Sequence, residues 1–365
     1  MSISITNVTI TGGMSFTGID PSFLYAFTNF TFTNGNILGA SSGNLSQFIA
    51  NYNTTGNTWL NNTTYYNITK PGFQVWTVPQ TGTYEIEVAG SRSGINTYAG
   101  GLFANGAIVR GRFSLSQGSN LTMAVGSYPV DTVNNNTYNG AGGGGGTFVV
   151  VTATGNPLII GGGAGGTGRW SGWEAANIKP GSNGSTNTYG TTSRQQPYGN
   201  AAPGGTLGQG GNSHVAANGT VSVNTYDSGG GGGFYSKGSN GAGGNVSTNQ
   251  SGGGGQSWSA NLLGGFNAAL YTAQATVGGF GGGGGGSPTC GGGGGGYSGG
   301  GGAYAPSNPA ADGGGGGGSY IDSSATTVAT SDGFYNGAGT FGGASITNLG
   351  RFNSNAGYIK ITLVG

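Results

Sequence analysis

The sequence predicts an all-β protein: a β-sandwich into which a bundle of polyglycine-II helices is inserted, with little α-helix. Three observations lead to this fold class. Glycine accounts for 88 of the 365 residues and is concentrated in nearly pure runs. Short segments with strand patterns and turn signals flank the glycine-rich part on both sides. Charged residues make up only 5% of the chain, whereas it contains 18 Tyr, 16 Phe and 5 Trp. Disordered chains are usually charged and poor in aromatics, so this composition favours a folded protein.

The chain divides into four predicted parts. Residues 1–25 are expected to form an N-terminal strand and attachment segment, because apolar and polar residues alternate there in part. Residues 26–160 supply most of the sandwich. Residues 161–343 are the inserted glycine bundle, and residues 344–365 hold the strand that closes the sandwich.

Strand signals are clearest in the sandwich part. Residues 84–88 (YEIEV) alternate strictly between polar and apolar side chains, and Thr81-Gly82 supplies the turn before them. The predicted strands are 73–78, 84–88, 102–114, 121–125, 148–151, 157–160 and 358–364, and one stretch, 45–52, is compatible with a helix. Short strands at this spacing are typical of a sandwich.

The glycine runs have two physical interpretations. They lie at 142–146, 229–233, 252–255, 281–286, 291–296, 299–302 and 313–318. Glycine loses more backbone entropy on ordering than any other residue, so such runs are disordered linkers or backbones packed too closely for a side chain. Flexible linkers are Gly/Ser mixtures, whereas these runs are nearly pure. Polyglycine-II helices packed side by side pair their backbone groups with one another. Because strands are predicted on both sides of the runs, we expect the ordered bundle.

Side chains suited to catalysis or metal binding are scarce. Cys290, the only cysteine, lies between glycine runs and is expected to be an inert, packed thiol. His214, the only histidine, has no carboxylate near it in sequence to orient it. Glu85 and Glu87 share one strand face; paired carboxylates can hydrolyse glycosides, but these two are expected to be solvated. Arg110 and Arg112 lie in one predicted strand and are not expected to form a basic patch. The sequence therefore predicts no enzyme, no catalytic residue, no metal site and no cofactor.

Charge and hydropathy argue against two classes of partner. The net charge is +1 and Lys and Arg do not cluster, so nucleic-acid binding is not expected. No stretch of 18 apolar residues occurs, so membrane insertion is not expected, and the N-terminus lacks a signal-peptide pattern. An Asn-, Thr- and Ser-rich chain of this kind suits a virion protein that is assembled in a host cell and released by lysis.

Aromatic side chains are the one positive signal for binding. Trp170 and Trp173 follow a glycine cluster in an expected loop, and Tyr189, Tyr198 and Trp258 lie in other expected loops. Tyr and Trp offer an apolar face with a polar edge, which suits sugar rings when Asn and Thr are neighbours. These five residues are the candidates for surface recognition. Alternatively, Trp170 and Trp173 cover the side of the glycine bundle.

The order of several motifs carries a resemblance to a known family. The motifs are residues 27–51, 72–90 (GFQVWTVPQTGTYEIEVAG), 140–150 (GAGGGGGTFVV), 157–166, 280–299 and 313–321. Over roughly residues 26–365 the chain resembles the glycine-rich ectodomain of anaplastic lymphoma kinase and leukocyte tyrosine kinase. The resemblance implies a tumour-necrosis-factor-like, jelly-roll sandwich with inserted polyglycine helices. Those receptors also have several cysteines, a signal peptide, a membrane helix and a kinase, so receptor signalling does not carry over. Polyglycine bundles also occur in bacteriophage tail-tip adhesins.

These observations predict a non-enzymatic fibre or adhesin on a virion or phage surface. The protein is therefore expected to be extracellular. Its partners would be other virion subunits, with formation of a homo-oligomer, and a host surface glycan or receptor touched by the loops between glycine helices. The first alternative is a capsid-decoration or filament-forming protein that assembles through its N-terminal strand. The second is a secreted ligand-binding module.

Overall fold

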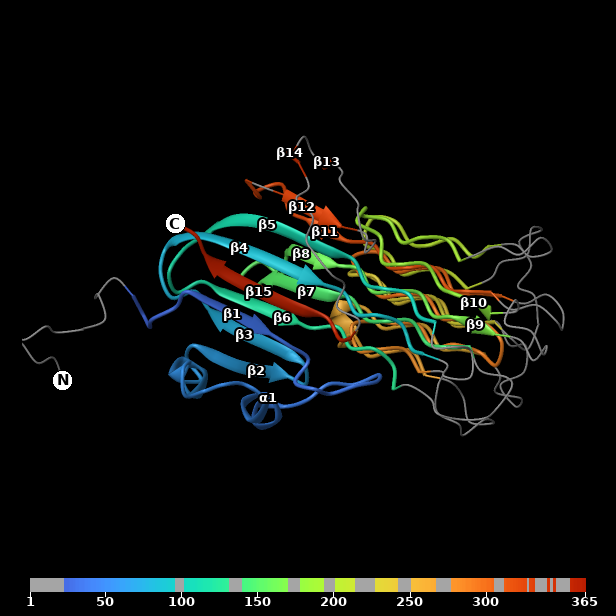
Figure 1. Ribbon diagram of the computed structural model, residues 1–365, viewed down its shortest axis with the longest axis horizontal. Helices are drawn as coiled ribbons and strands as arrows, with labels where there is room; N and C mark the ends of the chain where they lie inside the picture. Colours follow the sequence, from blue (N-terminus) through green and yellow to red (C-terminus); the bar gives the residue numbers. More distant parts are fainter. Residues whose placement is uncertain are drawn as a thin grey trace, which may run out of the picture.

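Two β-sheets and a set of long glycine-rich segments make up the computed structural model (Figure 1). The segments extend side by side from one end of the sheets. The structure describes residues 23–95, 102–130, 140–169, 178–193, 201–213, 227–241, 251–266, 277–304, 312–326, 328–331, 340–341, 344–345 and 355–365.

The sheets are antiparallel and form a sandwich, as predicted. In spatial order the five-stranded sheet contains β1 (Asn29–Phe32), β15 (Tyr358–Leu363), β4 (Gly82–Ala89), β5 (Ile108–Leu115) and β12 (Val328–Ser331). The six-stranded sheet contains β11 (Tyr320–Ile321), β8 (Pro157–Gly161), β7 (Thr147–Val151), β6 (Asn120–Ala124), β3 (Phe73–Thr77) and β2 (Tyr66–Lys70). Two short pairs join β9 (Gly168–Arg169) to β10 (Ile178–Lys179), and β13 (Thr340–Phe341) to β14 (Ala344–Ser345).

Alternating side chains place the main core between the sheets. In β4 the residues Tyr84, Ile86 and Val88 are buried, while the glutamates between them point away. The inner faces of both sheets contribute to one cluster that includes Ile86, Ile361 and Trp76. The strict alternation predicted for this strand is therefore confirmed, and its period of two is the reason that one face meets the core.

Aromatic residues fill the end of the core near the described N-terminal residues. The helix α1 (Leu45–Asn51) begins at a capping box formed by Asn44 and Gln47, and a 3-10 helix, η1 (Thr58–Asn61), follows it. Inside, the buried Gln74 side chain accepts hydrogen bonds from the hydroxyls of Tyr52 (2.7 Å) and Tyr66 (2.9 Å). This network satisfies polar atoms that would otherwise be costly to bury.

The glycine-rich segments are held together by their backbones. The run 291–296 lies among six others: 140–146, 163–166, 229–233, 279–285, 299–303 and 313–318; we call these seven segments the glycine core. The N–H groups of residues 291 to 296 donate in turn to Asp312, Ala141, Gly229, Gly315, Gly144 and Gly232, at 2.8–3.1 Å. The carbonyls of residues 291 to 295 accept in turn from Ala303, Gly166, Gly284, Gly300 and Gly163. Residues three positions apart in the run therefore bond to the same neighbouring stretch of chain.

Close approach of these backbones explains why the runs are pure glycine. A Cβ atom added to Gly294 would lie 2.2 Å from the carbonyl oxygen of Gly163, and one added to Gly231 would lie 1.9 Å from that of Gly294. Contacts this short to backbone atoms cannot be relieved by a rotamer change. Every residue of run 291–296 is approached in this way, because successive residues face different neighbours. The run is therefore ordered, and its glycines are required by space.

Outer segments need glycine at fewer positions. In residues 180–185 (PGSNGS) a Cβ on Gly181 would lie 1.9 Å from the Gly165 oxygen, and one on Gly184 would lie 2.2 Å from the Gly162 oxygen. The residues between these glycines carry side chains. This edge segment therefore has glycine at every third residue, whereas the central run 291–296 is glycine throughout.

A second hydrophobic cluster joins the glycine-rich segments to the six-stranded sheet. Phe73, Phe148 and Ile160 of the sheet pack with residues from glycine-rich segments: Phe234, Leu262 and Phe280. Trp258, in the 3-10 helix η4 (Trp258–Ala260), also packs there. The sheet is thus covered on one face by the other sheet and on the other face by these side chains.

Some predicted bounds differ from the structure. The strand expected at 102–114 begins at Ile108, because residues before it bond to glycine-rich neighbours instead: the Ala107 N–H donates to Gly162 at 2.8 Å. Strands β11 and β12 lie within the predicted 161–343 part yet pair with sandwich strands β8 and β5. The predicted N-terminal strand falls in residues 1–22, outside the described residues.

Candidate recognition site

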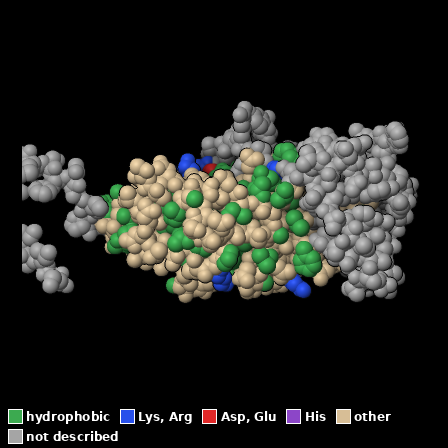
Figure 2. All heavy atoms as spheres, turned by 90° about the horizontal axis from the view of Figure 1, so that it is seen from below, with side chains coloured by type: hydrophobic (Ala, Val, Ile, Leu, Met, Phe, Trp, Pro, Cys, Tyr) green, Lys and Arg blue, Asp and Glu red, His purple; other side chains and the backbone are tan. Residues whose placement is uncertain are grey.

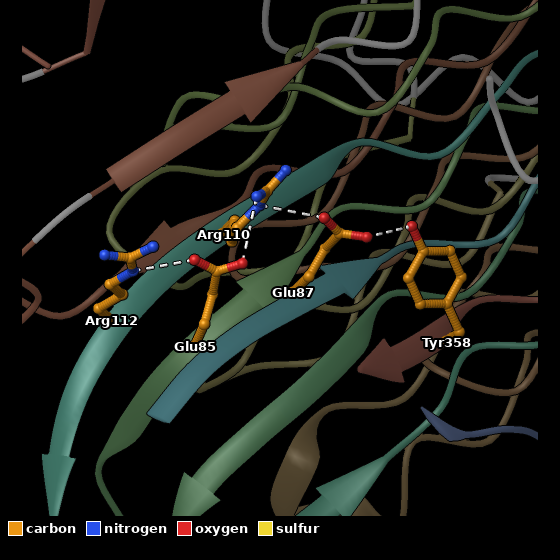
Figure 3. A network of polar contacts seen from close by, with 5 residues as sticks. All are labelled: Glu85, Glu87, Arg110, Arg112 and Tyr358. Atoms are coloured by element: carbon orange, nitrogen blue, oxygen red, sulfur yellow. Dashed lines mark hydrogen bonds and ion pairs between the residues drawn. The ribbon is translucent and has the colours of Figure 1, made fainter. Parts of the chain in front are cut away.

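Four charged side chains form a cluster on the outer face of strands β4 and β5 (Figure 3). Glu85 accepts from Arg110 (3.2 Å) and Arg112 (2.9 Å), and Glu87 pairs with Arg110 (3.1 Å). The hydroxyl of Tyr358 in β15 donates to the remaining oxygen of Glu87 at 2.7 Å. Burial raises the pKa of the Tyr358 phenol, and the Glu87 carboxylate raises it further.

The expectation that Glu85 and Glu87 are simply solvated was wrong, because both carboxylates pair with arginines. Antiparallel register places Glu85 opposite Arg112 and Glu87 opposite Arg110, so each carboxylate meets a guanidinium. All four carboxylate oxygens are engaged on an open strand face. This arrangement ties β4, β5 and β15 together.

Cys290 lies within the packed glycine-rich part and is completely buried. Burial raises the pKa of its thiol to about 12. We expect a thiol reagent such as an aromatic disulfide to leave Cys290 unmodified in the native protein at about pH 8, because the thiolate is the reactive form and the reagent has no access. Reaction should become complete in denaturant. Stoichiometric labelling of the folded chain, followed by mass spectrometry, would contradict this packing.

Two of the five aromatic candidates for surface recognition lie within the described residues. Trp170, Trp173 and Tyr198 lie outside the described residues. Tyr189 is 50% exposed, and its hydroxyl accepts a hydrogen bond from the Asn187 amide at 3.1 Å. Trp258 is only partly buried but stacks on Phe234, with ring centroids 5.7 Å apart, and meets Phe73 edge-on at 4.9 Å. Trp258 thus contributes to the junction with the sheet, and of the described candidates Tyr189 is the exposed one.

A groove of about 460 Å³ opens beside Tyr189. It is lined by residues 103–105, 180–187 and Thr191, none of which is charged. The backbone of the lining is anchored to the glycine-rich segments: the N–H groups of Ser182 and Ser185 both donate at 2.8 Å to run 313–318. The Asn105 N–H donates to Asn183 Oδ1 at 2.9 Å and joins the two sides of the groove. The groove is therefore formed before any ligand arrives.

Several polar groups of the groove have no partner among the described residues. The Asn183 side chain uses its oxygen to accept from Asn105, and its Nδ2 group makes no hydrogen bond within the described part of the chain. The same holds there for the side-chain polar atoms of Asn105, Ser182 and Thr186. The groove thus presents uncharged donors and acceptors beside the Phe103 ring, which is partly exposed. Sequence reasoning missed these residues, since Asn and Ser occur throughout the chain.

Three tyrosines continue the surface past the groove; we call Tyr235, Tyr297 and Tyr320 the tyrosine shelf. Tyr297 and Tyr320 stack with centroids 4.6 Å apart, and Tyr235, which is 56% exposed, meets Tyr297 edge-on at 6.3 Å. The backbone connects both places: the Ser319 N–H donates to the Asn187 carbonyl at 2.8 Å, and the Ser298 hydroxyl donates to the Thr188 carbonyl at 2.6 Å. The groove, Tyr189 and the tyrosine shelf therefore adjoin one another.

Asp322 is the charged group at the end of the tyrosine shelf. Its Oδ2 accepts from the Tyr320 hydroxyl at 3.2 Å. Burial alone would raise its pKa, but hydrogen bonds from Ser324 outweigh this and lower the pKa below its usual range. Elsewhere the surface is mostly uncharged: the face in Figure 2 consists mainly of uncharged polar side chains and backbone, with scattered hydrophobic groups and few charges.

No known protein-family profile matches the chain, and no curated protein sequence matches it either. The resemblance to the glycine-rich receptor ectodomain, and the jelly-roll connectivity that it implies, therefore stay predictions. Within the part of the chain that the structure describes, no helix has both the length and the apolar character needed to cross a membrane.

Proposed function

We propose that the protein is a non-enzymatic fibre or adhesin of a virion or phage surface, which recognises a host surface from a rigid glycine scaffold. The observation that carries this proposal is the glycine core. Its cohesion comes from backbone hydrogen bonds, so it needs no charged side chain and leaves the surface free to vary.

The direction of the glycine-rich segments supports a role in presenting a recognition surface to the host. Run 140–146 leads directly into β7, and run 163–166 follows β8, so one end of the glycine core adjoins the sandwich. At the opposite end Gly291 bonds to Asp312 and Ala303. Ala303 and Asp312 therefore lie at the end of the glycine core that is away from the sandwich. A compact body at one end, with glycine-rich segments that extend from it, suits a fibre (Figure 1).

The three-residue repeat of hydrogen bonds supports identifying the segments as polyglycine-II helices. This conformation has three residues per turn and no internal hydrogen bonds. A helix of this kind must direct its N–H and C=O groups to neighbours, and residues 291–296 do so in three directions that recur every third residue. Such packing should resist proteolysis, which suits a protein exposed outside cells.

The proposal is tested by locating the chain and by removing its N-terminus. Antibodies against the purified chain should label fibre tips of the particle in immunogold electron microscopy, and a chain lacking residues 2–20 should stay a soluble binder of host cells. The alternative, a capsid-decoration or filament-forming protein, predicts label spread over the capsid or along a filament, with assembly lost on the deletion. Absence of label from every particle surface would contradict both.

A further inference from the structure

We propose that the groove lined by residues 103–105 and 180–187, together with Tyr189, binds an uncharged oligosaccharide. This inference rests on the proposed recognition function and names its ligand. It differs from the expectation drawn from the sequence, because the groove lies on the flank of the glycine-rich segments and most of its residues were not candidates.

The chemistry of the lining points to sugar hydroxyls. Amide and hydroxyl groups of Asn183, Asn105 and Ser182 can donate to and accept from the same ligand hydroxyl, and within the described residues the Asn183 Nδ2 group has no other partner. Phe103 lines the groove, with the Arg92 guanidinium over its ring at 5.4 Å, and the exposed Tyr189 is bonded to the lining residue Asn187. Each offers an apolar ring to one side of a pyranose. The volume of about 460 Å³ lies in the range typical of ligand sites.

Other ligand classes fit the groove less well. Phosphates, sialic acids and sulfated sugars need a cation, and none of the lining residues is one. The Arg92 guanidinium, 5.4 Å from the Phe103 ring centroid, is buried and donates to the Ser93 carbonyl. An apolar ligand would leave the amide and hydroxyl groups without hydrogen bonds. A neutral sugar satisfies the polar groups and covers the rings at once.

The tyrosine shelf suggests a chain of sugars longer than the groove. Tyr235 is exposed and adjoins the stacked pair Tyr297 and Tyr320, while the segment 187–189 connects this pair to the groove. Tyr235 is the exposed ring of the shelf, and an exposed ring beyond the groove suits a further sugar unit. A disaccharide should therefore depend on the groove alone, and a longer oligosaccharide also on Tyr235.

The test is binding of the purified full chain to immobilised neutral oligosaccharides built from hexoses and N-acetylhexosamines, with sialylated and sulfated versions alongside. Neutral members should bind. Asn183→Asp keeps the oxygen that accepts from Asn105 but removes the Nδ2 donor, and it should weaken binding about tenfold. Phe103→Leu should have a similar effect. Tyr189→Phe should bind like the original chain, whereas Tyr189→Ala should not.

Asn53→Asp is the matched control, because this substitution makes the same charge change at an exposed position away from the groove. The Asn53→Asp variant should bind the neutral oligosaccharides like the original chain. All variants should keep the original melting temperature within a few degrees. Neutral binding that survives both Asn183→Asp and Phe103→Leu would overturn the groove while leaving the proposed function intact. Binding of charged glycans alone, or of host cells without any glycan, would overturn the ligand class only. Failure to bind both glycans and host cells would overturn the inference and the proposed function together.

Discussion

Gly294→Ala is expected to destabilise the protein by about 3 kcal/mol, at the upper end of the cost of overpacking a core. The added Cβ would lie 2.2 Å from the Gly163 oxygen and 2.8 Å from that of Ala164. These atoms belong to a backbone that is itself hydrogen-bonded, since the Gly163 N–H donates to Gly295 at 2.7 Å. Movement of that segment would break bonds to further segments, so the strain spreads. Thermal unfolding followed by calorimetry measures the loss.

Gly56→Ala is the matched control for this substitution. Gly56 is exposed, and a Cβ there would have as its nearest neighbour the Asn53 Nδ2 atom at 3.7 Å. Its effect should stay within about 0.5 kcal/mol. Gly231→Ala, at a second central position, should behave like Gly294→Ala. Equal melting temperatures for Gly294→Ala and Gly56→Ala would mean that the glycine core is not packed as described.

The second large effect is a loss of stability in alkali. Burial raises the pKa of Tyr52 to about 12, despite hydrogen bonds from its neighbours, and raises that of Tyr84 to about 12. Burial likewise raises the pKa of Tyr25 and Tyr66. An unfolded tyrosine titrates near pH 10, so between pH 10 and 12 the folded state holds protons that the unfolded state has released. The contribution of these buried tyrosines to the free energy of unfolding is therefore fully present below pH 10 and is lost as the pH rises through 12.

For Tyr52 alone the loss amounts to about 3 kcal/mol over this window. Denaturant midpoints measured from about pH 8 to pH 12, with tyrosinate absorbance recorded in parallel, test it. Tyr52→Phe should be less stable near neutrality, because the bond to Gln74 is lost, yet its stability should fall less steeply above pH 10. Midpoints that stay level up to pH 12, or native tyrosines that all titrate near pH 10, would refute the argument.

Local patterns in the sequence predicted much of the fold. The alternation in residues 84–88 identified a strand with one buried face, because side chains of a strand alternate between its two faces. The expected strands at 73–78, 121–125, 148–151, 157–160 and 358–364 all occur, with bounds shifted by one residue or so. Asn44 and Gln47 supply a capping box where the helical stretch was expected. Each of these signals depends on near neighbours in the chain.

The candidate site was harder to predict. Its two sides, represented by Asn105 and Asn183, lie 78 residues apart in sequence. They meet through the bond from the Asn105 N–H to Asn183 Oδ1 and through one from the Gly184 N–H to the Asn105 carbonyl. Asn, Ser and Thr are so common here that their identity marks no position. Trp258 looked like a loop aromatic but packs at the junction, and the ion pairs of Glu85 and Glu87 depend on the register with β5.

Pure glycine runs by themselves required either disorder or backbone-to-backbone packing, because no residue there has a side chain to bury. Only the tertiary structure decided which run lies beside which. Hydrogen bonds between glycine backbones are chemically identical, so the sequence does not specify the partner of run 291–296. The partners follow from where the sandwich strands and the aromatic junction place each segment, and the same placement brings the two sides of the groove together.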